Sequence, residues 1–252
     1  MPGPAAERWA ERQSGRGVPP HILAAAEADP HRFPAAEFTA PAEAADTPSR
    51  QAALELLGAA GTVLDVGCGG GAAAFALVPP AGRVTGVDQQ QDMLDRFAET
   101  AAERGVEHRS VLGRWPDVGA EAGRADVVVC HHVLHNVVDL PPFLVALARA
   151  ARRGVVVEMF TEHPLAWLDP LWARFHGLRR PPSATADDAV AVLREIGVQP
   201  AVTRWERARL PRHEPGLVSR RLCLPASREP EVAAALSGLH RPRTVATLHW
   251  PC

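Results

Sequence analysis

One stretch of this sequence consists mostly of residues with little or no side chain, as expected where the backbone approaches a ligand closely. The segment VLDVGCGGGAAAF, residues 63–75, runs from β-branched residues into Gly67, Gly69 and Gly71. Glycines there let the chain turn tightly and let a ligand lie against backbone N–H groups. Asp65 stands just before the first glycine, where its carboxylate would repel a pyrophosphate and attract a cationic group. The segment therefore predicts a binding turn for a ligand with a cationic end.

A second acid, Asp88, follows the turn by about 20 residues, which is the offset expected of a ribose-binding acid. The glycines alone leave an alternative open, because Gly67, Gly69 and Ala72 also satisfy the dinucleotide fingerprint G-x-G-x-x-G/A. Asp65 disfavours that alternative, since a pyrophosphate would lie close to its charge. Asp88 could instead serve only as the cap of the helix that follows it.

Three histidines follow an apolar run in VVVCHHVLHNVVDL, residues 127–140. Histidine removes protons near neutral pH, so we expect His132 or His135 to act as a general base. A helix beginning near Val133 would place these two side chains within about one turn of each other, on the same side of a pocket. Alternatively, the histidines orient the loop or pack as neutral core residues. We expect no metal site, because no fourth zinc ligand follows at a recognisable spacing.

Alternating strand and helix patterns from residue 51 onward would position these groups. Runs such as VVVC and GVVVEM lack polar alternation, as expected of central parallel strands covered on both faces. The pattern predicts a doubly wound α/β sheet, with its ligand beyond the carboxyl ends of the strands. The predicted strands are Thr62–Val66, Arg83–Val87, His108–Leu112, Asp126–Cys130 and Gly154–Met159, followed by strand-like runs in residues 198–210 and 243–250. The predicted helices are Gln51–Leu57, Ala72–Leu77, Gln90–Arg104, Pro142–Ala151, residues 185–197 with Thr185 as N-cap, Pro215–Leu222 and Glu229–Leu239.

The sequence resembles the class I methyltransferases that use S-adenosylmethionine, of the bacterial small-molecule type. The family motif D-x-G-x-G-x-G matches Asp65 to Gly71, and VTGVDQQQDML carries the acid Asp88 at the end of the second strand. These motifs cover roughly residues 50–160. The resemblance implies a mostly parallel seven-stranded sheet in the order 3-2-1-4-5-7-6, with the last strand antiparallel. It also implies methyl transfer with S-adenosylmethionine as the cofactor.

The resemblance implies a role for each matching residue. Asp65 and the turn of Gly67, Gly69 and Gly71 would hold the methionine portion, and Asp88 would accept hydrogen bonds from both ribose hydroxyls. The remaining contacts would be Gln89 and Met93 at the adenine slot, and Cys130 and His131 beside the sulfonium, where the fourth strand ends.

The loop after the third strand departs from the family pattern. Where the family often has Gly-Asp-Ala, this chain has Gly113, Arg114 and Trp115. Trp115 could stack on the adenine, with Asp117 replacing the missing acceptor, or it could be an ordinary core or lid aromatic.

Composition and charge disfavour several classes of protein. A formal net charge of −2 lacks the basic field of nucleic-acid-binding proteins, and no D/N-P-P-Y/F sequence follows the fourth strand, as base N-methylation would require. The sequence contains no run of 18 apolar residues, so it predicts no membrane span. The four scattered cysteines fit a reduced, cytoplasmic setting.

We expect an N-terminal helical cap in residues 1–50 and one methyltransferase domain in residues 51–252, with a lid insertion in residues 161–184. Trp167 and Trp172 of the insertion would form an apolar wall for a substrate, or would merely cover the sheet edge. The sequence thus predicts methyl transfer to an oxygen or nitrogen atom of a small-molecule acceptor. The alternatives are an NAD-dependent oxidoreductase and a non-catalytic cofactor-binding partner protein.

Overall fold

A seven-stranded sheet organises the computed structural model, which describes residues 3–30, 40–41, 44–207, 214–240 and 243–252. Its strands are β1 (Gly61–Val66), β2 (Ala81–Asp88), β3 (Glu107–Leu112), β4 (Ala125–His131), β5 (Ala151–Phe160), β6 (Ala201–Glu206) and β7 (Thr244–Pro251). They lie in the order β3-β2-β1-β4-β5-β7-β6, with β7 antiparallel to both its neighbours and the other pairs parallel. The doubly wound sheet, its strand order and its antiparallel last strand are therefore confirmed.

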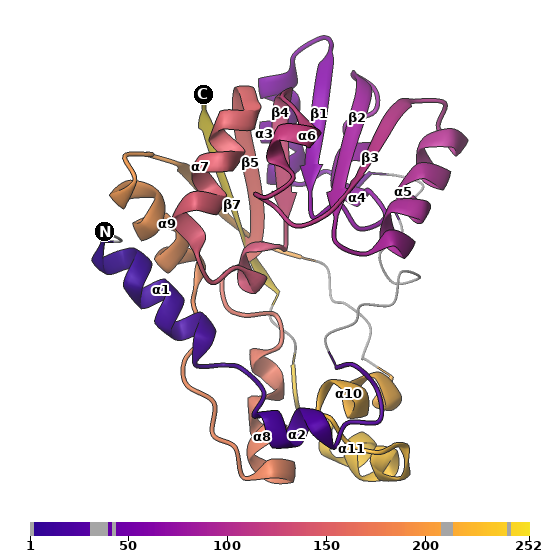
Figure 1. The fold of residues 1–252 in the computed structure, drawn as a ribbon, viewed down its shortest axis with the longest axis vertical. Coiled ribbons are helices and arrows are strands. Elements are labelled where there is room, and N and C mark those ends of the chain that lie inside the picture. Colours follow the sequence, from indigo (N-terminus) through magenta and orange to yellow (C-terminus); the bar gives the residue numbers. More distant parts are fainter. Residues whose placement is uncertain (1–2, 31–39, 42–43, 208–213, 241–242) are drawn as a thin grey trace.

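Helices cover both faces of the sheet, so its central strands are apolar on both sides (Figure 1). One face carries α3 (Pro48–Leu57), α4 (Ala72–Phe75) and α5 (Gln91–Glu103). The other carries α6 (Gly119–Ala122), α7 (Leu140–Ala150) and α9 (Ala186–Glu195), with α1 (Pro4–Ser14) packed on α7 and α9. The buried runs 127–129 and 155–157 supply valines to both cores, which explains their lack of polar alternation.

A group of short helices forms a helical lobe, which lies below the sheet in Figure 1. The lobe contains α2 (Pro20–Ala24), α8 (Asp169–His176), α10 (Pro215–Arg221) and α11 (Glu229–Ala235), with single 3₁₀ turns at Ala166–Leu168 and Ala226–Arg228. It has its own apolar core, in which Trp172 is 4% exposed and Trp167 is packed at the margin. Trp172 thus serves the packing of the lobe, because such short helices need a shared core to be stable. The lobe follows directly from the carboxyl ends of β5 and β6.

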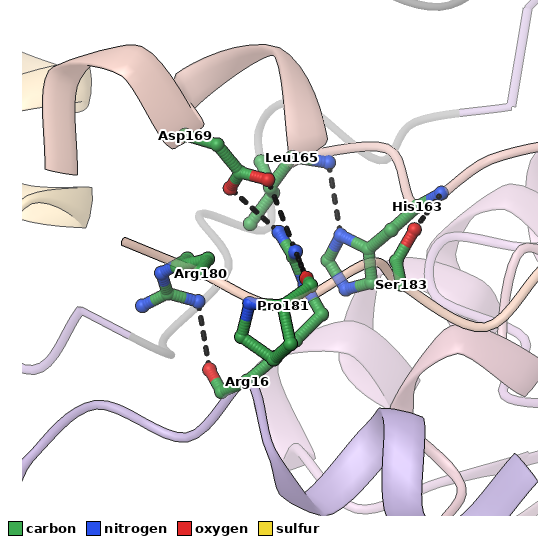
Figure 2. Close-up of polar contacts among 7 residues, drawn as sticks. All are labelled: Arg16, His163, Leu165, Asp169, Arg180, Pro181 and Ser183. Atoms are coloured by element: carbon green, nitrogen blue, oxygen red, sulfur yellow. Dashed lines mark hydrogen bonds and ion pairs between the residues drawn. The ribbon is translucent and has the colours of Figure 1, made fainter. Parts of the chain in front are cut away.

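The segment after α1 is tied to the start of α8 and to the segment that follows α8 (Figure 2). The buried guanidinium of Arg16 donates to both oxygens of Asp169, at 2.6 and 3.0 Å, and to the carbonyl of Pro181 at 2.6 Å. Arg180 in turn donates to the carbonyl of Arg16 at 2.7 Å and lies over the ring of Trp172, 4.1 Å from its centroid. We call Arg16, Asp169, Arg180 and Pro181 the neck cluster.

Local signals place most of the helix ends. Thr185 and Asp188 form a reciprocal capping box at the start of α9, as the acidic first turn predicted. The predicted helix near Val133 is instead one 3₁₀ turn, Leu134–Asn136. The chain between β4 and α7 is short, and α7 begins only at Leu140 with prolines in its first turn, so no longer helix fits between them.

Candidate active site

The glycine turn joins β1 to α4 in a conformation that side chains would block. Gly67, Gly69 and Gly71 have φ angles of 71°, 51° and 84°, in the left-handed region that favours glycine. A Cβ atom at Gly67 would overlap the side chain of Val133, and one at Gly71 would overlap the ring of Phe75. The turn is therefore bare because both its backbone geometry and its surroundings require it.

Asp88, at the end of β2, has a carboxylate that backbone N–H groups hold in place. Its Oδ2 accepts from the N–H of Gly69 at 2.9 Å, and its Oδ1 accepts from the N–H of Gln90 at 3.0 Å. Gln90 itself is the N-cap residue of α5, so Asp88 does not occupy the cap position. Each carboxylate oxygen can accept a further hydrogen bond, so Asp88 could receive two vicinal hydroxyls.

Asp65 lies beneath the turn, whereas the sequence placed it at the mouth. Its side chain is 1% exposed, and its Oδ2 accepts from the N–H of Ala74 in α4 at 3.1 Å. Burial, opposed by the bond from Ala74 and assisted by the charge of Asp88, raises the pKa of Asp65 to about 7. The carboxylate thus supports the first turn of α4 from inside the protein.

Leu112 and Gln89 are exposed beside Asp88, where β2 and β3 end. Leu112, the partner of Asp88 in the strand register, is 52% exposed, which is unusual for a leucine at the end of a strand. Met93 is buried, 3% exposed, at the start of α5. The sequence argument missed Leu112, although an apolar residue directly before the departing loop was a usable signal.

Trp115 is a buried residue of the core. It is 6% exposed, packs in the core against Gly119 and donates its indole N–H to the carbonyl of Phe143 at 3.3 Å. This placement favours a core aromatic over a residue that stacks on adenine, because the side chain is buried among core residues. Asp117 is exposed in the same loop.

The residues at the end of β4 face different surroundings. The side chain of Cys130 is fully buried in the core, and burial raises the pKa of its thiol, so the thiol stays uncharged. Alternate residues of a strand point to opposite faces, and this one points into the core, while its contact with the sulfonium stays a prediction. His131 follows it, partly exposed, with Nδ1 3.9 Å from Oε2 of Glu158 on β5.

His132 is held in a strained backbone conformation at the centre of the site. Its φ angle is 60°, which is rare for a residue other than glycine and is typical of functional sites. Its ring stacks on Phe160, with centroids 4.8 Å apart, and its Nε2 lies 2.9 Å from Oε1 of Glu158 and 3.0 Å from Nη1 of Arg207. A carboxylate and a guanidinium therefore meet at one nitrogen of a partly exposed histidine.

His135 lies near His132 but is buried, 4% exposed. Its Nε2 is 3.1 Å from the carbonyl of Phe160, and its ring lies edge-on to His163 at 5.4 Å. Burial lowers the pKa of His135 to about 3, so the ring is neutral at physiological pH. His163 is neutral too, because burial and the nearby arginines of the neck cluster lower its pKa to about 4. His135 therefore corresponds to the alternative of a packed, neutral histidine.

Glu158 and Arg207 were not among the predicted site residues. Glu158 is 6% exposed and lies opposite His131 and Thr247 in the strand register. Burial alone would raise its pKa, but His131, His132 and a hydrogen bond from Ser49 hold the pKa below its ordinary value. An acid inside the apolar run GVVVEMF was the signal for Glu158, whereas Arg207 follows an edge strand without a local pattern.

Two comparisons with known proteins find similarity to methyltransferases. Residues 64–158 match the family model described as "Methyltransferase domain". The chain is 33% identical over 130 residues to the ubiquinone biosynthesis O-methyltransferase of Sodalis glossinidius, covering 50% of this chain and 51% of that one. It is 27% identical over 172 residues to the protein of that name from Caulobacter vibrioides, covering 58% and 67%. The chain therefore spans about half the length of the first of these relatives.

Solved structures share the fold at low sequence identity. The YcgJ protein of Bacillus subtilis superposes with a TM-score of 0.55 at 18% identity, covering 81% of this chain and 97% of that one. A precorrin-8w decarboxylase from Methanobacterium thermoautotrophicum gives a TM-score of 0.50 at 17% identity, covering 86% and 98%. Such likeness concerns the fold alone, since one fold supports several reactions.

Two searches of the described residues found neither a metal site nor a membrane span. No group of three or more His, Cys, Asp or Glu side chains in that part of the chain could hold a metal ion. None of its helices is long and apolar enough to cross a membrane.

Proposed function

Since this chain contains a class I S-adenosylmethionine-dependent methyltransferase domain, we propose that the protein transfers a methyl group to an oxygen atom of a small-molecule acceptor. The proposal goes beyond the domain in two respects, the acceptor and the attacking atom. The relatives named above are O-methyltransferases, and the chemistry around His132 favours the same attacking atom.

The residues at the carboxyl end of the sheet fit S-adenosylmethionine. The glycine turn leaves backbone free of side chains, Asp88 offers two fixed oxygens for ribose hydroxyls, and Leu112 offers an exposed apolar surface for adenine. We propose that these groups, with Gln89, hold the cofactor. S-adenosylmethionine supplies a methyl group that is already activated on a sulfonium.

His132 carries the proposed chemistry, because its Nε2 lies between an acid and a guanidinium. A hydroxyl acceptor must lose its proton as the methyl group is transferred, and Nε2 of His132 takes it when the acceptor hydroxyl replaces Arg207 as the donor to that nitrogen. The carboxylate of Glu158 then stabilises the imidazolium. Arg207 stabilises the oxygen anion as its charge develops, and its positive charge disfavours a cationic amine as the acceptor. His135 is not the base in this proposal, because its side chain is buried, 4% exposed, whereas that of His132 is 29% exposed.

An acceptor screen tests this proposal directly. Purified protein is incubated with S-adenosylmethionine and panels of phenols, aliphatic alcohols and amines, and methylated products and S-adenosylhomocysteine are measured by mass spectrometry. We expect transfer to hydroxyl acceptors, with His132→Gln lowering kcat by about 100-fold while cofactor affinity is retained. His108→Gln, at an exposed position of β3, is the matched control with unchanged kcat. Transfer to amines alone, or an unchanged rate in His132→Gln, would contradict the proposal.

A further inference from the structure

The neck cluster carries more positive charge than its carboxylate balances. Asp169 forms its ion pair with Arg16, whereas the described residues place no carboxylate in contact with Arg180. The guanidinium of Arg180 instead donates to the carbonyl of Arg16 and lies over the ring of Trp172. Burial and the charge of Arg16 lower the pKa of Arg180. An anion placed beside these two arginines would therefore be stabilising, because it would balance the charge that Asp169 leaves over.

Three N–H groups around the cluster have no acceptor among the described residues. Figure 2 shows the guanidinium of Arg16 between Arg180 and His163, and the Nε atoms of both arginines are buried and unpaired. Nδ1 of His163 accepts the backbone N–H of Leu165 at 3.1 Å, so the proton of this neutral ring is on Nε2, from which no described residue accepts. Buried N–H groups nearly always have a partner in native proteins, so these three are available to an acceptor atom of a ligand.

The neck cluster lies on the opposite side of His132 from the proposed cofactor residues. In the sheet, β4 separates β1, β2 and β3, which carry those residues, from β5. His163 follows β5, and its ring lies edge-on to that of His135 at 5.4 Å. His135 contacts the carbonyl of Phe160, whose ring stacks on His132. The side of the proposed base that faces away from the cofactor residues thus leads to the neck cluster.

We propose that Arg16, Arg180 and His163 form a subsite for a carboxylate group of the methyl acceptor, so that the acceptor is a hydroxy acid. The inference rests on the proposed function, because it takes His132 as the point at which the acceptor hydroxyl reacts. A carboxylate has the single negative charge that the cluster would balance, whereas a phosphate monoester carries roughly two charges at neutral pH. Its two oxygens also accept several hydrogen bonds, as three unpaired N–H groups require.

Small carboxylates test the subsite without methyl transfer. The probes are acetate and benzoate, and their neutral counterparts are acetamide and benzamide, which have nearly the same shape. Calorimetric titrations at constant ionic strength measure the affinities, and NMR of ¹⁵N-histidine-labelled protein shows whether the His163 signals shift. We expect each acid to bind at least about tenfold more tightly than its amide and to shift the His163 Nε2 signal, because charged hydrogen bonds are the stronger ones.

Variants of two residues identify the groups that bind the acid. Arg180→Met removes the charge and the unpaired donor but keeps an apolar side chain over Trp172, and it should weaken benzoate binding by about tenfold. His163→Asn removes the Nε2 donor, while the Asn oxygen can still accept from Leu165, and binding should weaken by about threefold. Arg179→Met makes the same charge change at the exposed neighbouring position and is the matched control with unchanged binding. Thermal unfolding of each variant verifies that it is folded.

Kinetics with hydroxyl acceptors complete the test. The KM of a hydroxy acid should lie at least about tenfold below that of its amide, and Arg180→Met should remove most of this difference. Equal affinity for the acids and the amides, or benzoate binding that is unchanged in both Arg180→Met and His163→Asn, would overturn the subsite, whichever hydroxyls are methylated. Weaker binding of S-adenosylmethionine in Arg180→Met, with an unchanged acceptor KM, would also overturn it by assigning the cluster to the carboxylate of the cofactor. Acid binding at His163 in a protein that methylates no hydroxyl would count against the proposed function and leave the subsite standing.

Discussion

Asp65 and Asp88 lie at or near the ends of the neighbouring strands β1 and β2, yet different groups surround their carboxylates. Both oxygens of Asp88 are held by backbone N–H groups at a partly exposed edge, which keeps its charge available to a ligand. Asp65 is buried with one bond from Ala74, and its pKa is raised to about 7. Asp65 therefore exchanges a proton near neutral pH.

The raised pKa of Asp65 predicts a pH-dependent stability. The ordinary pKa of 3.8 describes the unfolded chain, so the folded protein binds this proton more tightly between about pH 4 and 7. The stabilisation is fully present below pH 4 and is lost as the pH rises through 7, by roughly 4 kcal/mol in all. Asp65→Asn does not titrate, so its unfolding free energy should fall less between pH 5 and 8 than that of the unmodified protein. Urea unfolding at both pH values measures this difference.

Asp46→Asn, at an exposed position before α3, is the control and should keep the pH dependence of the unmodified protein. An equal pH dependence in Asp65→Asn and Asp46→Asn would show that the proton on Asp65 contributes nothing to folding.

Among the structural elements, the glycine turn and the 3₁₀ turn after β4 restrict each other's conformation. Val133, which begins the segment leading into the 3₁₀ turn, packs where a side chain at Gly67 would lie. His132, the residue before Val133, has its strained φ where the chain leaves β4 and stacks its ring on Phe160. The geometry of the proposed base and that of the cofactor turn are therefore set together.

Gly67→Ala should accordingly damage the protein more than a comparable glycine substitution. Its φ of 71° costs an alanine about 1–2 kcal/mol, and the overlap with Val133 adds to that cost. Gly105 has a φ of 62° with open space around it, so Gly105→Ala should lose only the backbone part. Denaturant unfolding measures both losses, and calorimetry with S-adenosylmethionine should find weaker binding in Gly67→Ala alone. Gly67→Ala combined with Val133→Ala should recover only the part due to overlap, and equal losses in the two single variants would contradict this account.

The elements of the sheet could be predicted because their signals are local. Uniform apolar runs, glycines and the Thr185 cap each act within a few residues and placed the strands, whereas the strand order came from the resemblance to a known family. The positions of Trp115 and Glu158 depend instead on what packs against them from distant parts of the chain, such as Phe143 and Ser49. A strand pattern tells which residues share a face but not which partner meets them there. This is why Asp88 was correctly placed at a strand end while the surroundings of His132 and His135 were not foreseen.

Across the whole molecule, the neck cluster determines how the helical lobe is held against the sheet. Arg16 links the segment after α1 to Asp169 at the start of α8 and to Pro181 after that helix, and its side chain is 5% exposed (Figure 2). The lobe follows from the carboxyl ends of β5 and β6, where Glu158 and Arg207 lie. The lobe core is small, and it therefore depends more on such links than the sheet does.

Arg16→Met should loosen the lobe before it loosens the sheet. The change removes the bidentate bond to Asp169 and the bond to Pro181, and it leaves an acid that is 29% exposed and partly solvated. We expect the unfolding free energy to fall by about 1–3 kcal/mol, less than for a fully buried pair because water reaches Asp169. Hydrogen exchange of backbone amides should accelerate in α2 and α8 while β4 and β5 stay protected, since local opening needs only the neck bonds to break.

Arg12→Met, which breaks the more exposed pair with Asp188, is the matched control and should leave exchange in α2 and α8 unchanged. Uniform acceleration across the sheet and the lobe in Arg16→Met would mean that the two open as one unit, so that the neck cluster contributes to global stability and not to the placement of the lobe.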